Sequence, residues 1–89
     1  MDIVQRATAG TMESSDAYVE VEPGTDGINL QLESVVMAQF GDSIQKTVRK
    51  LLTDMSVENA NVRIVDRGAL ECVIRARVET AVLRGKGRG

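Results

Sequence analysis

Residues 17–34 read Ala17-Tyr18-Val19-Glu20-Val21-Glu22-Pro23-Gly24-Thr25-Asp26-Gly27-Ile28-Asn29-Leu30-Gln31-Leu32-Glu33-Ser34. Apolar and polar side chains alternate in residues 17–22 and again in 28–34, with the period of two that half-buried β-strands show. The segment between these runs holds one proline and two glycines, which is turn chemistry. The stretch therefore predicts two strands, and because the connection is short, it predicts that they pair as a β-hairpin.

The hydrophobic period changes to three and four after residue 34, which predicts a helix. Its apolar face is formed by Val36, Phe40, Ile44, Val48, Leu51 and Met55. We expect this face to be buried against the inward residues of the two strands. Ser34 is a candidate N-cap, and Gly41 predicts a kink or a break because glycine is a poor helix former.

A second helix is predicted from Gly68 onward, with Asp66 as its cap. Its apolar face comprises Leu70, Val73, Ile74, Val78, Ala81 and Val82. A strand is expected at 61–66, with Val62 and Ile64 inward, and a short strand at 2–8.

The predicted order of elements is β-β-β-α-β-α, which indicates a small α+β domain. We expect an antiparallel or mixed sheet with both helices packed on one face. The domain is expected to cover residues 1–84. The glycine-rich and basic residues 85–89 are expected to form a flexible C-terminal tail.

The composition of the 89 residues excludes several kinds of chemistry. The chain has no histidine, and so no side chain that titrates near neutral pH without perturbation. The one cysteine, Cys72, can form neither a Cys-His nucleophile nor a zinc site. We therefore expect no catalytic residue and no bound metal. We expect the Cys72 thiol to be buried or half-buried and to have a packing role. A chain of this composition is expected to bind or carry something.

The net charge of −2 conceals an uneven distribution along the sequence. Residues 1–45 carry eight acidic side chains against one basic, a balance of −7, while residues 46–89 carry five against ten, a balance of +5. This pattern favours oriented docking on a protein partner; a solvated surface without a role is the alternative. Two aromatic residues and a pI near 5.0 disfavour nucleic-acid binding.

No apolar run approaches the roughly 20 residues that span a bilayer, so we expect no membrane association. The chain opens without a secretory signal pattern, and a lone cysteine cannot form an internal disulfide. These features favour the cytoplasm.

A small, hydroxyl-rich segment, Gly10-Thr11-Met12-Glu13-Ser14-Ser15-Asp16, precedes the first alternating run. It is the one place in the sequence where a group could be attached to an accessible hydroxyl on a mobile turn. Gly10 gives the backbone conformational freedom there. Glu13 and Asp16 are candidate recognition points for basic residues of a modifying enzyme; alternatively, Asp16 caps the turn, and both roles can coexist.

This segment resembles the modification site of the citrate lyase acyl carrier (gamma subunit) family. Two further blocks carry the resemblance. Gln39-Phe40-Gly41-Asp42-Ser43-Ile44 is similar to the family's Gln-Phe-Gly-Asp-x-Ile. Asp66-Arg67-Gly68-Ala69-Leu70-Glu71-Cys72-Val73-Ile74-Arg75-Ala76-Arg77 is similar to its Lys-Gly-Ala-Leu-Asp-Cys-hydrophobic-x-Arg-Ala-Arg. The family often has glycine where this chain has Ser15.

The resemblance implies that Ser14, two residues before Asp16, is the attachment site of 2′-(5″-phosphoribosyl)-3′-dephospho-CoA. It implies a non-catalytic carrier of acetyl and citryl thioesters, whose partners are the transferase (alpha) and lyase (beta) subunits and a prosthetic-group transferase. Together these subunits cleave citrate to acetate and oxaloacetate. The alternatives are the acyl carrier of malonate decarboxylase and an unmodified interaction module. The standard four-helix carrier fold is disfavoured by the two alternating runs.

Overall fold

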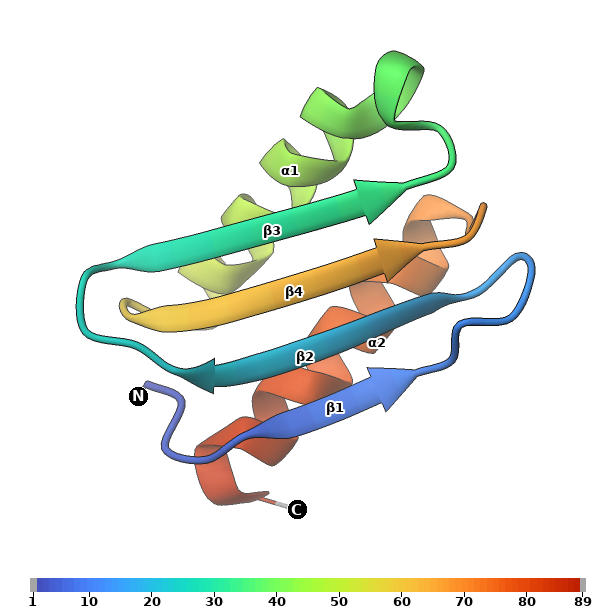
Figure 1. Cartoon of the computed structure of the whole chain (residues 1–89). Coiled ribbons are helices and arrows are strands. Elements are labelled where there is room, and N and C mark those ends of the chain that lie inside the picture. The colour runs from blue at the N-terminus through green and yellow to red at the C-terminus, as the bar shows by residue number, and fades with distance from the viewer. Residues whose placement is uncertain (1, 89) are drawn as a thin grey trace.

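The computed structural model describes residues 2–88, so Met1 of the predicted domain and Gly89 of the predicted tail lie outside the described residues. The elements follow the predicted order β-β-β-α-β-α (Figure 1). They are β1 (Ala7–Gly10), β2 (Ala17–Pro23), β3 (Ile28–Ser34), α1 (Met37–Asp54), β4 (Ala60–Asp66), α2 (Glu71–Leu83) and a final π-helical turn η1 (Arg84–Arg88). The α+β class is confirmed, and the first strand begins later than predicted.

The sheet has the order β1-β2-β4-β3. The prediction of a hairpin between β2 and β3 is therefore wrong, because β4 lies between them. β2 pairs with β4 antiparallel and β3 pairs with β4 parallel. Alternation in a sequence defines which face of a strand is buried, but it does not define the neighbouring strand.

Ala60, the first residue of β4, explains the geometry of the connection between β2 and β3. It pairs with Pro23 at the end of β2 and with Ile28 at the start of β3. The connection crosses the beginning of β4, and the Ala60 N–H donates to the Gly27 carbonyl at 3.1 Å. A Cβ at Gly24 would lie 3.0 Å from the Ala60 backbone, so glycine is needed at this crossing.

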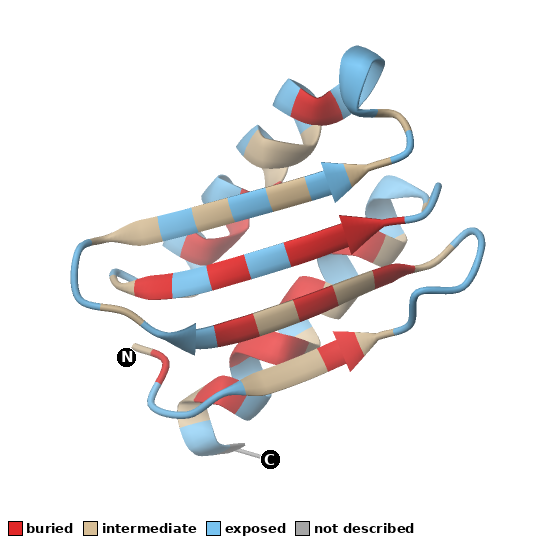
Figure 2. Ribbon diagram, in the orientation of Figure 1, coloured by how far each residue is buried: buried red, intermediate tan, exposed pale blue. Residues whose placement is uncertain are grey.

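Both helices cover the same face of the sheet, as predicted (Figures 1 and 2). The core between the layers is aliphatic. Its fully enclosed members include Val19, Val21, Val48, Leu52, Val62, Ile64, Val78 and Val82. The opposite face of the sheet is polar: Glu20 accepts a hydrogen bond from the Tyr18 hydroxyl at 2.7 Å and pairs with Arg6 and Arg63.

Neither helix begins with the predicted cap. Helix α1 starts after Val36, and Ser34 instead accepts a hydrogen bond from the Val36 N–H at 3.1 Å. Helix α2 starts after Leu70, while Asp66 binds the N–H groups of the connection ahead of it. In both cases the polar side chain organises the turn that leads into the helix. Helix α1 runs through Gly41 as one element.

Three side chains that were predicted to be buried are exposed. Phe40 is 53% exposed and Leu70 is 72% exposed, and Cys72 is an exposed free thiol. The helical period identified the correct faces, but the N-terminal turn of α1 projects past the edge strand β3 (Figure 2), and Leu70 lies in the connection before the first residue of α2. The prediction that Phe40 and Leu70 belong to the core and that Cys72 packs inside is wrong.

The chain directly beyond α2 lies against the N-terminal segment. The Gly85 carbonyl accepts hydrogen bonds from the N–H groups of Val4 and Gln5, at 2.9 and 3.2 Å. The Arg84 guanidinium donates to the Thr8 carbonyl at 2.8 Å. Arg84 and Gly85 thus hold the start of this segment against the domain, and a flexible tail at residues 85–89 stays a prediction.

Candidate functional site

Residues 11–16 connect β1 to β2 and contain a tight turn. The Asp16 N–H donates to the Glu13 carbonyl at 3.2 Å, which places Ser14 and Ser15 at the two central positions. Ser15 has a positive φ of 66°, while Ser14 does not. This is the pattern of a type II turn, in which the second central residue adopts the conformation that glycine favours.

The same segment forms a G1 β-bulge against the residue after β4. The Ser15 N–H donates to the Arg67 carbonyl at 2.9 Å, and the Arg67 N–H donates to the Asp16 carbonyl at 2.9 Å. In this bulge the first residue has positive φ, and it is usually glycine. Ser15 occupies that position. The turn is therefore anchored to the β4–α2 connection. The sequence predicts a mobile turn, and the structure instead has an exposed turn whose backbone is held in place.

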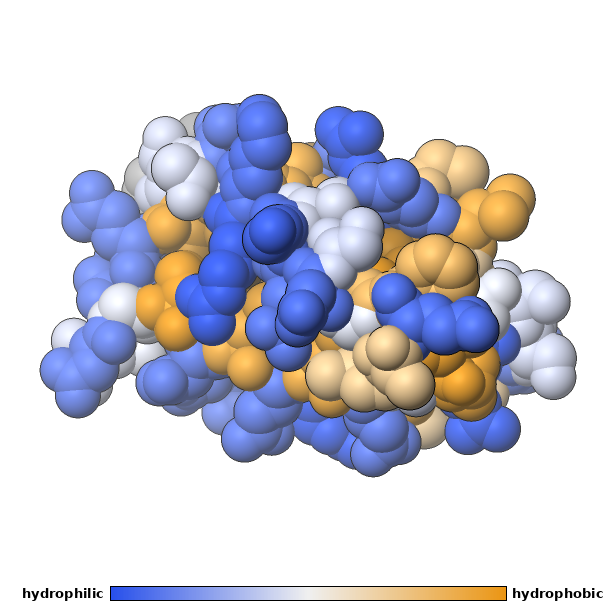
Figure 3. Space-filling view, turned by 90° about the horizontal axis from the view of Figure 1, so that it is seen from above, coloured by the Kyte–Doolittle hydropathy of each residue, from blue (hydrophilic) through white to orange (hydrophobic). Residues whose placement is uncertain are grey.

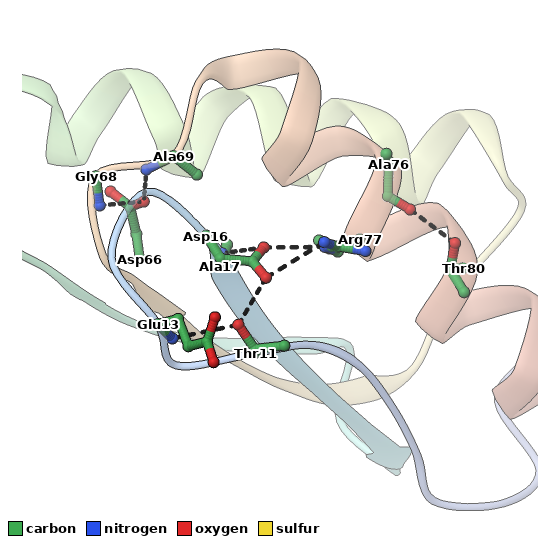
Figure 4. Close-up of polar contacts among 10 residues, drawn as sticks. All are labelled: Thr11, Glu13, Asp16, Ala17, Asp66, Gly68, Ala69, Ala76, Arg77 and Thr80. Atoms are coloured by element: carbon green, nitrogen blue, oxygen red, sulfur yellow. Dashed lines mark hydrogen bonds and ion pairs between the residues drawn. The ribbon is translucent and has the colours of Figure 1, made fainter.

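The Asp16 carboxylate is the polar centre of the turn (Figure 4). Its Oδ2 accepts a hydrogen bond from the Thr11 hydroxyl at 2.7 Å, and its Oδ1 accepts one from the Ala17 N–H at 2.7 Å. Arg77, which points from α2 toward the turn, donates from Nε to Oδ1 at 3.0 Å and from Nη2 to Oδ2 at 3.2 Å. The Thr11 hydroxyl also accepts from the Glu13 N–H at 3.2 Å.

These donors stabilise the ionised carboxylate of Asp16. The Thr11 hydroxyl, followed by the Ala17 N–H and Arg77, lowers the pKa of Asp16 from 3.8 to about 2. Both carboxylate oxygens are occupied and the side chain is only 15% exposed. Asp16 is therefore a poor proton acceptor, and the geometry supports the interpretation that it shapes the turn.

Ser14 is exposed, and its side chain makes no hydrogen bond to any residue between 2 and 88. Its hydroxyl is thus free to react. The Glu13 side chain is also exposed and has no partner within the described part of the chain. Gly10 has a φ of 85°, and a Cβ there would lie 1.8 Å from the Ala17 carbonyl oxygen. Glycine is therefore required at this position because β1 and β2 approach each other closely, and not mainly to leave space for an attached group.

Asp66 holds the segment to which the turn is anchored. Asp66 is 1% exposed, and its carboxylate accepts a hydrogen bond from the Ser34 hydroxyl at 2.7 Å. It also accepts hydrogen bonds from the N–H groups of Gly68 and Ala69 at 3.1 and 2.9 Å (Figure 4). Asp66 therefore ties the ends of β3 and β4 to the start of α2. It fixes the backbone next to Arg67.

Sequence reasoning missed the roles of Thr11, Arg67 and Arg77. Arg77 lies 61 residues from Asp16 in the sequence, so no local spacing could associate the two. Arg67 contributes through its backbone, which has no signature in a single sequence. Of the candidates that the sequence did identify, the structure places Ser14, Glu13 and Asp16 together on one turn.

The N-terminal ends of α1 and α2 lie at the same end of the sheet as the turn (Figure 1). Apolar side chains reach the surface on that right-hand side of the molecule, among other places (Figure 3). We define the apolar patch as Val35, Met37, Phe40 and Leu70, which are 42–72% exposed. A groove adjoins it between α1 and α2, and Phe40, Ile44, Leu70 and Ile74 contribute to its walls. Among the helices that the structure describes, none has both the length and the apolar character needed to cross a membrane.

Comparison with known proteins gives the family. The model of the malonate decarboxylase delta subunit (an acyl carrier protein family) matches residues 4–85. The citrate lyase acyl carrier protein of Escherichia fergusonii is 52% identical over 85 residues, covering 94% of this chain and 88% of the relative. That of Streptococcus uberis is 47% identical over 87 residues, covering 98% and 86%.

The chain belongs to the citrate lyase acyl carrier protein family. These relatives are carrier subunits, not enzymes in their own right. Among solved structures, a chain of a Pseudomonas malonate decarboxylase hetero-tetramer matches with a TM-score of 0.76 and 28% identity, covering 86% of this chain and 79% of that one. The family and the carrier class that the sequence resemblance implied are thus confirmed, while the attachment residue stays a prediction.

Proposed function

We propose that this chain is the acyl carrier (gamma) subunit of a citrate lyase, and that Ser14 holds 2′-(5″-phosphoribosyl)-3′-dephospho-CoA through a phosphodiester. When bound, that group supplies a thiol on which acyl thioesters form. The observation that carries the proposal is the exposed Ser14 hydroxyl, which makes no hydrogen bond to the described residues, on a turn whose backbone is anchored to Arg67 at Ser15 and Asp16. A bulky group attached there would displace no core residue.

The residues around Ser14 position the hydroxyl and leave its activation to another protein. The carboxylate of Asp16, two residues after Ser14, is held by hydrogen bonds from Thr11, Ala17 and Arg77. Its pKa is about 2. It is therefore unsuited to remove the proton of Ser14. We infer that a separate prosthetic-group transferase supplies the general base, and that this chain supplies a rigid and recognisable turn.

The apolar patch supports membership of a complex. A single exposed leucine is a normal surface feature, but a group of exposed apolar side chains such as Val35, Phe40 and Leu70 is typical of a protein interaction site. We propose that the larger alpha and beta subunits of citrate lyase cover this patch when the carrier docks. The exposed free thiol of Cys72 supports a reducing compartment, and hence the cytoplasm.

Intact mass after co-expression with the prosthetic-group transferase tests the proposal. We expect the wild-type chain to gain the mass of the group, Ser14→Ala to gain nothing while keeping its fold, and Ser15→Ala to be loaded. An adduct mapped to Ser15, or a loaded Ser14→Ala chain, would contradict the assignment of the site.

Malonate decarboxylase is the second candidate complex, because the matching family model is named for its delta subunit. The identity of 52% to a citrate lyase carrier, against 28% to a chain of the malonate decarboxylase structure, favours citrate lyase. Mixing the loaded, acetylated chain with the larger subunits of either enzyme distinguishes the two. We expect citrate cleavage with the first set and no malonate decarboxylation with the second.

A further inference from the structure

The charges around Ser14 are not balanced once a phosphodiester is attached. Asp16 is already paired with Arg77, whose Nε and Nη2 both donate to its carboxylate. The Glu13 side chain is exposed and has no partner among the residues that the structure describes. A phosphodiester on Ser14 would add a negative charge next to Glu13, and like charges at such short range repel each other. A cation near the attachment point would offset this repulsion.

Besides Arg77, the fold brings Arg67 to the turn. Its backbone exchanges hydrogen bonds with Ser15 and Asp16, both at 2.9 Å. Paired residues of adjacent strands have Cα atoms about 5.5 Å apart, and neighbours in the chain are about 3.8 Å apart. The Cα atom of Arg67 thus lies within roughly 10 Å of that of Ser14, a span that two extended side chains bridge.

The guanidinium of Arg67 is also available. Arg67 is exposed, and its side chain makes no hydrogen bond or ion pair with any residue that the structure describes. Arg6 and Arg63 differ in this respect because both pair with Glu20 on the polar face of the sheet. Arg77 differs because Asp16 occupies it.

We propose that Arg67 is the internal counter-ion of the phosphate attached to Ser14, an inference that rests on the proposed function. A guanidinium presents a planar fork of N–H donors that matches two phosphate oxygens. The bulge fixes the Arg67 backbone relative to Ser14. The Arg67 guanidinium therefore stays close to a phosphate attached at Ser14. Arg67 would hold the first phosphate of the group close to the turn and orient the group as it leaves the domain.

A phosphoserine introduced at position 14 probes this site without the transferase. Its second pKa is near 6 and is lowered by a nearby cation, because the cation favours the dianion. We expect phosphorus NMR titration to give a pKa about one unit higher in Arg67→Gln than in wild type at low salt. Arg67→Lys should recover part of the shift. Arg75→Gln is the matched control, since Arg75 is an exposed arginine without a partner in the described chain.

Two results of this titration would rule out the proposed role of Arg67. A second pKa unchanged in Arg67→Gln would overturn the proposal, and so would an equal change in Arg75→Gln, because that would report only the net charge. Glu13, Asp16 and Arg77 are the other charged groups at the turn, and they are present in all of these variants.

The loaded protein gives a second readout. In chain purified with its prosthetic group, the Nε–H resonance of Arg67 should move on attachment, and that of Arg75 should stay. Failure of the proposed function would appear as no adduct on Ser14 by intact mass. Failure of the Arg67 proposal would leave the adduct in place and the Arg67 resonance unmoved, so the two results are distinguishable.

Discussion

Arg77 in α2 donates hydrogen bonds to both carboxylate oxygens of Asp16, at 3.0 and 3.2 Å. Asp16 ends the turn that holds Ser14 and lies 61 residues before Arg77 in the sequence. Together with the Thr11 hydroxyl, this contact couples the position of α2 to the shape of the turn. A helix that is packed against the core thereby fixes a surface loop. We expect changes at either residue to act through the shape of the turn.

A double-mutant cycle tests this coupling. We expect Asp16→Asn and Arg77→Gln each to slow loading of Ser14 by the transferase, and the double variant to be no slower than the slower single one, because both remove the same contact. The initial rate of mass gain gives the measurement. If Asp16 were instead recognised by cations of the transferase, the two effects would add. Glu13→Gln tests that kind of recognition directly, because the Glu13 side chain is free.

Acid should weaken the fold through Asp16. Its pKa is lowered from 3.8 to about 2 in the folded chain, so the ionised form stabilises the fold above pH about 4. That contribution should be lost as the pH falls from about 3.8 to about 2. Urea denaturation of wild type and Asp16→Asn across this range should show a shallower decline for the variant. Some decline should persist, since hydrogen bonds also lower the pKa values of Asp2 and Glu20.

Ser15→Gly should stabilise the protein. Ser15 has a φ of 66°, in the left-handed region that costs a non-glycine residue on the order of 1 kcal/mol. We expect a gain of about 1 kcal/mol in the free energy of unfolding, with loading at Ser14 retained. Ser15→Val is the opposite test, because a β-branched residue is strained there and should destabilise. Equal stability of the three chains would contradict the bulge.

Leu51 and Phe40, on the same predicted face of α1, should differ in their contribution to stability. Leu51 is 8% exposed, so Leu51→Ala should cost roughly 2–5 kcal/mol. Phe40 is 53% exposed, so Phe40→Ala should cost less than about 1 kcal/mol. Denaturant midpoints measure both. A large loss for Phe40→Ala would place this side chain back in the core.

The apolar patch should be needed for assembly but not for loading. We expect Leu70→Asp to weaken binding to the larger citrate lyase subunits about tenfold or more, as loss of an interface anchor does. Leu83→Asp is the control, since Leu83 is also an exposed leucine, at 48%, but lies at the other end of α2. Titration calorimetry measures both. Equal losses for the two variants would exclude a specific role for the patch.

The type, order and buried faces of the elements could be predicted from the sequence because they depend on local periodicity, whereas the bounds of β1 and the start of α2 differ from the prediction. The alternation in residues 17–22 and the three-four spacing after residue 36 both mark residues that the structure buries, such as Val19 and Val48. The order β-β-β-α-β-α followed directly. The turn at 10–16 was also identified, because small and hydroxyl residues gather there.

Contacts between distant segments could not be predicted in this way. The hairpin between β2 and β3 was the natural expectation for two strands joined by a short turn, yet β4 pairs with both. The two halves of the chain also carry opposite charge in sequence but interleave in space. Arg77 lies against Asp16, and Arg63 lies against Glu20.

The sequence by itself thus determined the secondary structure, the α+β class, the family and the candidate serine, since each depends on neighbouring residues or short motifs. Only the tertiary structure decided which strands meet, that Arg77 and Thr11 hold Asp16, and that Arg67 anchors the turn. The physical reason is that pairing across the sheet and between layers depends on how the whole chain closes its core. Residues many positions apart are brought within hydrogen-bonding distance only when that core has formed.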